Sequence, residues 1–143
     1  MERNFSDNMF PSRMIDIWAA LETYFDGLYY GDVETLRSVF HPKATYASPA
    51  SGPLLIKTMP EYFELVAKRE PPSDRKEDRV DEVVSLDFAG SKMVFARVRC
   101  AIGEKHFTDF LTLILVDGRW QILSKVFDYT YRNSKKTGNP ALG

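Results

Sequence analysis

One acidic residue interrupts an otherwise apolar segment of the chain. Asp109 lies in FTDFLTLILV, where side chains of a strand alternate between the two faces of a sheet. With the register described below, Asp109 shares its face with Phe107, Leu111 and Val98. A carboxylate there loses hydration, which favours its protonated form unless a donor satisfies it. Asp109 could therefore serve as a general acid or base. The alternative is a structural carboxylate that Tyr, Trp or backbone donors satisfy, as is usual for buried polar groups.

Two further carboxylates could lie near Asp109. Asp128 falls on the same predicted face, near the end of the last strand, and Glu82 falls one strand beyond Asp109 if 89–91 form a three-residue loop. Carboxylates that lie close together at one opening of a pocket would share a proton or bind a cationic ligand. The alternative is a solvated sheet edge, which ordinary exposure statistics favour.

Aromatic side chains could form the walls of a ligand pocket. We expect Trp18, Tyr24, Tyr46 and Tyr62 to bind a ligand together with Asp128. The alternative is that these aromatic residues pack in the core, which is the commoner role of aromatics at helical spacing.

The sequence carries no sign of a metal or cofactor site. Its two histidines, His41 and His106, form no HxxxH or His-x-His pair, and there is no glycine-rich phosphate loop and no GxSxG motif. The single cysteine, Cys100, falls in the apolar row of a strand, which favours packing over a nucleophilic role. We therefore expect no metal and no cofactor.

Two hairpins should position Asp109. Asp117-Gly118 between two apolar runs is typical of a type I′ turn, and Gly103-Glu104 suits a type II′ turn. Two-residue loops at both places put Asp109 opposite Val126 on one side and beside Val98 on the other. The apolar rows of three strands then fall on one face, although a bulge at the Asp117-Gly118 turn would reverse one strand relative to the other.

The opposite face of these strands is expected to be partly apolar. It would carry Phe95, Phe110, Phe127, Ile114, Leu123 and Tyr129, interrupted by Arg97, Arg99, Thr108, Thr112 and Lys125. Monomers seldom expose so much contiguous apolar surface, so we expect a homodimer that forms through this outer face. The alternative is a crowded but solvated sheet.

The rest of the chain supplies helices and shorter strands. Apolar spacing, caps and breakers predict helices over 12–31, 32–41 and 58–69, and strands over 44–47, 53–57, 79–88, 93–102, 107–116 and 119–131. Residues 1–11 should form a flexible arm, 12–132 a single domain, and 133–143 a flexible tail.

Composition narrows the class of protein. A chain of 143 residues fits one domain, and 19 basic against 20 acidic residues argue against binding to nucleic acid or to a membrane surface. No apolar run approaches the length of about 20 residues that spans a membrane, and the N-terminus lacks the apolar core of a signal peptide. We therefore expect a cytoplasmic protein.

The order of the elements is similar to that of a known fold. A helix, a short helix ending in Phe40-His41-Pro42, two short strands, a third helix and four long strands ending in DGRWQILSKVF resemble the nuclear transport factor 2-like superfamily, over about residues 14 to 131. The SnoaL-like, "putative lumazine-binding" branch is the most similar. The resemblance implies a cone-shaped α+β domain, with three N-terminal helices packed on a strongly curved, mostly antiparallel sheet, and frequent homodimers.

Two functions are compatible with this resemblance, because the superfamily includes both enzymes and binding modules. The first is a small-molecule-binding domain with an apolar pocket between the helices and the sheet. The alternative is a SnoaL-like isomerase, dehydratase or cyclase that uses Asp109 as general acid or base. An Asp109 carboxylate facing an open cavity would favour catalysis, whereas a salt-bridged Asp109 in a filled interior would favour a structural role.

Overall fold

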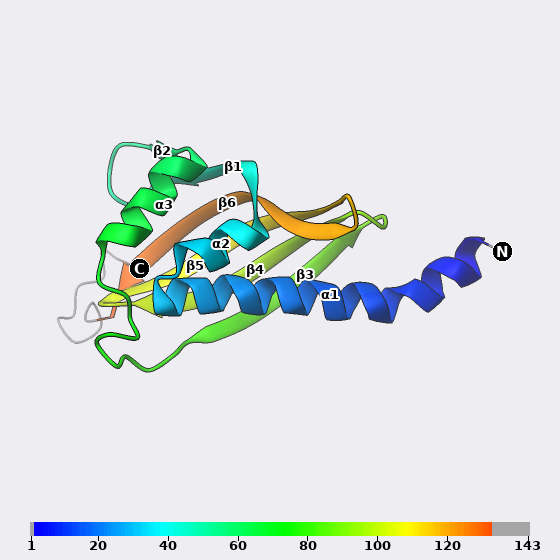
Figure 1. Cartoon of the computed structure of the whole chain (residues 1–143), viewed down its shortest axis with the longest axis horizontal. Coiled ribbons are helices and arrows are strands. Elements are labelled where there is room, and N and C mark those ends of the chain that lie inside the picture. The colour runs from blue at the N-terminus through cyan, green and yellow to red at the C-terminus, as the bar shows by residue number, and fades with distance from the viewer. Residues whose placement is uncertain (1, 133–143) are drawn as a thin grey trace.

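Three helices cover one face of a six-stranded sheet in the computed structural model, which describes residues 2–132 and the side chains of residues 13–132 (Figure 1). The helices are α1 (Glu2–Tyr30), α2 (Val33–Val39) and α3 (Met59–Lys68). The strands are β1 (Phe40–Ser48), β2 (Leu55–Lys57), β3 (Asp81–Ala89), β4 (Met93–Ile102), β5 (Lys105–Val116) and β6 (Arg119–Tyr131).

The sheet is open, curved and mostly antiparallel. Its strand order is β2-β1-β6-β5-β4-β3, and only β1 and β6 run parallel to each other. The three helices pack on its concave face, where β1 and α3 approach each other at one end (Figure 1). The predicted α+β class, with helices on a curved and mostly antiparallel sheet, is confirmed.

Local chemistry fixes the ends of the short helices. The Asp32 side chain accepts a hydrogen bond from the Thr35 N–H and caps α2. A capping box begins α3, with Glu61 Oε1 accepting from the Thr58 N–H at 2.8 Å. Helices α1 and α2 approach closely because position 27 is glycine: a Cβ on Gly27 would lie 2.5 Å from the Leu36 side chain.

The first helix is longer than its sequence pattern indicates. It begins at Glu2 rather than after a cap at Ser12, and Figure 1 shows its N-terminal turns projecting past the sheet. The division into arm, domain and tail stays a prediction, and residues 133–143 lie outside the described residues.

The two hairpins form as predicted. Asp117 and Gly118 have positive φ values of 53° and 75°, as a type I′ turn requires, and Leu115 pairs with Trp120. Across the other hairpin, Asp109 pairs with Val98, so the predicted register of β4 against β5 is confirmed.

A β-bulge within β6 overturns the predicted register beyond the hairpin turn. Leu113 pairs with Ile122 but Thr112 pairs with Ser124, which leaves Leu123 as an extra residue. One extra residue exchanges the two faces of the strand that follows. The prediction that Lys125, Phe127 and Tyr129 face outward is therefore wrong, and so is the prediction that Val126 and Asp128 face the core: Lys125 is buried, whereas Val126 is 42% exposed.

A second irregularity moves Glu82. The pairing of β3 with β4 shifts between Val83 and Ser85, so that Glu82 lies opposite Arg99 rather than Val98. Glu82 is exposed and lies 3.8 Å from the Arg99 guanidinium. Glu82 therefore does not join Asp109 on the inner face, and it lies at a solvated sheet edge, the alternative that exposure statistics favoured.

The core fills the space between the helices and the concave face of the sheet. Its largest fully buried side chains come from every helix and from the central strands: Tyr24, Tyr62, Phe40, Ile17, Leu21, Leu36, Leu111, Leu113, Ile122, Val66, Val94 and Val98. Two charged side chains, those of Asp109 and Lys125, are buried within this layer.

Candidate functional site

Asp109 and Lys125 meet in the interior. Asp109 is 0% exposed and Lys125 is 5% exposed, and Lys125 Nζ lies 3.9 Å from Asp109 Oδ2. Tyr24 of α1 donates its hydroxyl hydrogen to the same Asp109 oxygen. Lys125 Nζ in turn donates to the hydroxyl oxygens of Tyr24, at 2.7 Å, and of Tyr62 from α3, at 3.4 Å. One polar network thus joins two helices to two strands.

The register of the sheet creates this meeting. Asp109 pairs with Phe127, and Leu111 pairs with Lys125, so Asp109 and Lys125 are diagonal neighbours on the inner face of β5 and β6. On the other side of β6, Lys125 pairs with Tyr46 of β1. Without the bulge at Leu123, Lys125 would point away from the core.

Aromatic rings surround the buried ammonium group. Lys125 Nζ lies 5.0 Å from the ring centroid of Tyr24, 5.1 Å from that of Tyr62, 5.3 Å from that of Phe127 and 5.7 Å from that of Tyr46. The negative faces of aromatic rings attract cations, and more so where water is excluded. These rings add to the attraction of the Asp109 carboxylate.

The environment keeps Lys125 charged and keeps Tyr24 and Cys100 protonated. Burial opposes the charged form of Lys125, but Tyr62 and Asp109 outweigh this effect, so the pKa of Lys125 lies above its ordinary value. Burial, followed by the charge of Asp109, raises the pKa of Tyr24 and of the Cys100 thiol. Cys100 is therefore a neutral packing residue at physiological pH, because a thiol needs to ionise to act as a nucleophile.

A cavity of about 190 Å³ lies between the helices and the sheet, with Lys125 in its wall. Its aromatic lining comes from Tyr46, Tyr62, Phe107, Phe127 and Tyr129. Tyr46 and Tyr62 stack with their ring centroids 4.6 Å apart. The cationic lining comes from Arg69, Lys105 and Lys125.

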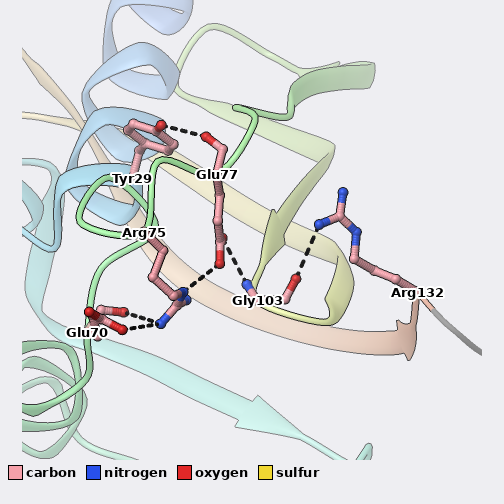
Figure 2. A network of polar contacts seen from close by, with 6 residues as sticks. All are labelled: Tyr29, Glu70, Arg75, Glu77, Gly103 and Arg132. Carbon is pink, nitrogen blue, oxygen red and sulfur yellow. Dashed lines mark hydrogen bonds and ion pairs between the residues drawn. The ribbon is translucent and has the colours of Figure 1, made fainter.

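A polar network holds the loop that follows α3 (Figure 2), and Arg69, at the start of this loop, lines the cavity. Arg75 binds the carboxylates of Glu70, at 3.1 Å, and of Glu77, at 2.6 Å. Glu77 accepts a hydrogen bond from the Gly103 N–H at 3.0 Å, and its carbonyl oxygen accepts one from the Tyr29 hydroxyl at 2.6 Å. The loop is thereby fastened both to α1 and to the β4–β5 hairpin.

The structure gathers four of the predicted site residues. Tyr46 and Tyr62 line the cavity. Tyr24 and Asp109 do not line it, but they are linked to Lys125, which does, through the Tyr24 hydroxyl group. Trp18 does not join them, because it is 44% exposed on α1 and takes no part in the lining.

Asp128 lies on the opposite face of the sheet. It is exposed there because of the bulge, and together with Glu82 it lines a wider and more open hollow of about 520 Å³. Arg99 and His106 also line this hollow, so it carries charges of both signs. We favour the smaller cavity as a ligand site, since ligand sites are typically enclosed and mostly apolar with a few polar groups.

Sequence reasoning missed the two cations that matter most in the cavity. The sequence predicted Lys125 on the outer face, and Arg69 was not among the predicted site residues. The one available signal was the lysine in the apolar run LSKVF, which a bulge would turn inward.

Among the side chains that the structure describes, those of residues 13–132, no group of three or more His, Cys, Asp or Glu could hold a metal ion. In the described part of the chain, no helix is both long and apolar enough to cross a membrane. Location in the cytoplasm stays a prediction.

The buried ion pair predicts strong coupling between two substitutions. Asp109→Asn should lower the free energy of unfolding by about 3–5 kcal/mol, because it leaves the Lys125 ammonium buried without its counter-ion. Adding Lys125→Met should restore part of this loss, and urea denaturation of both single variants and the double variant measures the coupling. The exposed pair Glu64 and Lys68, at 3.0 Å, is the matched control and should show coupling of about 0.5 kcal/mol or less. Additive effects of the substitutions at 109 and 125 would contradict the pairing.

Comparisons with known proteins agree with this fold. The family model described as "putative lumazine-binding" matches residues 12–128. An NTF2-like protein of unknown function from Silicibacter pomeroyi is 25% identical, with a TM-score of 0.75 over 83% of this chain and 97% of that one. A second, from Shewanella baltica, is 23% identical, with a TM-score of 0.75 over 84% of this chain and 95% of that one. No curated protein matches the sequence significantly. The chain belongs to the family described as "putative lumazine-binding", within the nuclear transport factor 2-like superfamily.

Proposed function

We propose that the protein binds a small, largely aromatic or apolar organic molecule in the cavity between its helices and its sheet. The observation that carries this proposal is the lining of the cavity, in which aromatic rings enclose a space that also contains a few polar groups. This combination is typical of small-molecule sites, where apolar walls supply affinity and isolated polar groups orient the ligand. The description of the family supports a ligand-binding role, and the similar structures of unknown function name no ligand.

The volume of the cavity sets the size of the ligand. About 190 Å³ is less than the roughly 300–1,000 Å³ of sites for drug-sized ligands. It is somewhat more than the ~150 Å³ of an apolar protein cavity that accepts benzene. The ligand should therefore be about one ring in size.

The position of Asp109 favours binding over catalysis. A general acid or base needs to reach the reacting group within hydrogen-bonding distance, directly or through one water. Asp109 is 0% exposed and does not line the cavity. Its Oδ2 atom accepts a hydrogen bond from Tyr24 and forms the ion pair with Lys125. A SnoaL-like isomerase, dehydratase or cyclase that uses Asp109 directly is therefore the less supported alternative.

Filling the cavity should abolish binding. Leu65 lines the cavity. Leu54 does not line it and is 65% exposed, so it serves as the control position. Leu65→Trp should weaken the binding of one-ring compounds, detected by saturation-transfer NMR, by at least about tenfold. Leu54→Trp should leave binding unchanged. Unaltered binding to a folded Leu65→Trp variant, or no binding of any such compound to the unmodified protein, would rule out this cavity as the site.

We also propose that two copies of the chain associate through the outer face of the sheet. An apolar strip of four exposed side chains from β4, β5 and β6 supports this proposal: Met93 (45%), Phe95 (40%), Phe110 (39%) and Val126 (42%). The rings of Phe95 and Phe110 lie 5.4 Å apart, so the strip is continuous between β4 and β5. The bulge alters its predicted composition, with Val126 in place of Phe127 and Tyr129.

A charge within the strip should separate the copies. Phe110→Glu would place a carboxylate in the apolar contact, and analytical ultracentrifugation should show a shift from dimer to monomer. Ile56→Glu is the control, because Ile56 is 66% exposed on β2, outside the strip. A monomeric unmodified protein, or a Phe110→Glu variant that remains dimeric, would contradict this interface.

A further inference from the structure

Arg69 lines the cavity, and one hydrogen-bonding edge of its side chain has no partner among the described residues. It follows the last residue of α3, where its backbone N–H bonds to the Leu65 carbonyl oxygen at 3.2 Å, and its side chain lines the cavity. The Nε and Nη2 atoms of Arg69 are buried and have no hydrogen-bond partner among the described residues. Buried donors without partners destabilise a protein, most of all when they carry charge, so this arrangement calls for a reason.

Nearby carboxylates are engaged elsewhere. Glu70, the next residue in the chain, and Glu77 are both bound by Arg75 (Figure 2). Asp109 accepts from Tyr24 and pairs with Lys125. Among residues 2–132, no aspartate or glutamate lines the cavity. The protein thus leaves the guanidinium charge of Arg69 without a counter-ion there.

Further positive charge lines the same cavity. Lys105 Nζ lies 4.4 Å from the ring centroid of Tyr129, and Lys125 contributes its buried ammonium. Three cationic side chains therefore line a cavity that has no carboxylate in its lining among the described residues. Such an enclosed space concentrates positive potential and favours an anionic ligand.

The shape of the unpaired edge indicates which anion fits. Nε–H and one N–H of Nη2 point the same way within the guanidinium plane, and this fork matches the two oxygens of a carboxylate. The stacked rings of Tyr46 and Tyr62, with Phe127 beside them, offer a surface for a flat apolar body. We propose that the ligand is a one-ring organic carboxylate whose carboxylate group binds to Nε and Nη2 of Arg69 while its ring packs among these aromatic side chains. This inference rests on the proposed binding function and specifies its ligand class.

Matched acids and amides test the inference. Benzoate, phenylacetate and cyclohexanecarboxylate would be titrated into the full chain by calorimetry, alongside their neutral primary amides. At least one acid should bind about ten- to hundredfold more tightly than its amide, because a charge-assisted bidentate contact is lost in the amide. Arg69→Gln should abolish this preference. Lys68→Gln removes the same charge from an exposed neighbour, which pairs with Glu64 outside the cavity, and should preserve the preference.

A second variant separates binding from folding. Arg69→Met keeps an unbranched apolar side chain and removes the unpaired donors, so the melting temperature should stay the same or rise while acid binding is lost. A clear loss of stability in Arg69→Met would show that Arg69 is a structural residue and would overturn the inference.

The remaining outcomes distinguish the inference from the function on which it rests. If the amides bind as tightly as the acids, or if Arg69→Gln retains the preference, the cavity still binds ligands but Arg69 does not select a carboxylate. If neither acids nor amides bind, both the inference and the proposed binding function fail.

Discussion

The ion pair between Lys125 and Asp109 constrains the whole core. A charge removed from water needs a partner, and both of these side chains are buried. Their meeting requires the extra residue at Leu123, because a strand without it would turn Lys125 outward. It also requires the hydroxyl groups of Tyr24 and Tyr62, which fix the positions of α1 and α3 over the sheet.

The same pair shapes the cavity between the helices and the sheet. Lys125 occupies the boundary between the packed interior and the open space, with Asp109 on one side and the cavity on the other. Asp109 offsets the charge of Lys125, whereas Arg69 has no such partner in the described part of the chain. The protein therefore has one cation whose charge is balanced within the fold and another whose charge is not. This difference, more than the number of charges, is the basis of the proposal that the ligand is an anion.

Turns and caps could be predicted from the sequence because their chemistry is local. Asp117-Gly118, the Thr58 capping box and the alternation of β4 gave the hairpins, α3 and the pairing of Asp109 with Val98. The bulge could not be predicted, because Val126 and Phe127 are neighbours and both are apolar. Each of the two alternating sets of side chains in β6 could therefore have faced the core. The partners that decide the matter, Tyr24 and Tyr62, lie 101 and 63 residues from Lys125 in the chain. The unpaired edge of Arg69 is likewise a tertiary property, and no local pattern reveals it.

The inward position of Lys125 is the central claim, and NMR of the lysine ammonium groups tests it most directly. A buried ammonium that donates to Tyr24 and Tyr62 should exchange its hydrogens slowly with water at neutral pH, and its signal should be missing from a Lys125→Met variant. Surface lysines such as Lys68, which is 74% exposed, should exchange too fast to be seen under the same conditions. If every lysine ammonium exchanges rapidly in the folded protein, Lys125 faces solvent. That result would contradict the bulge, the ion pair and the cationic lining of the cavity.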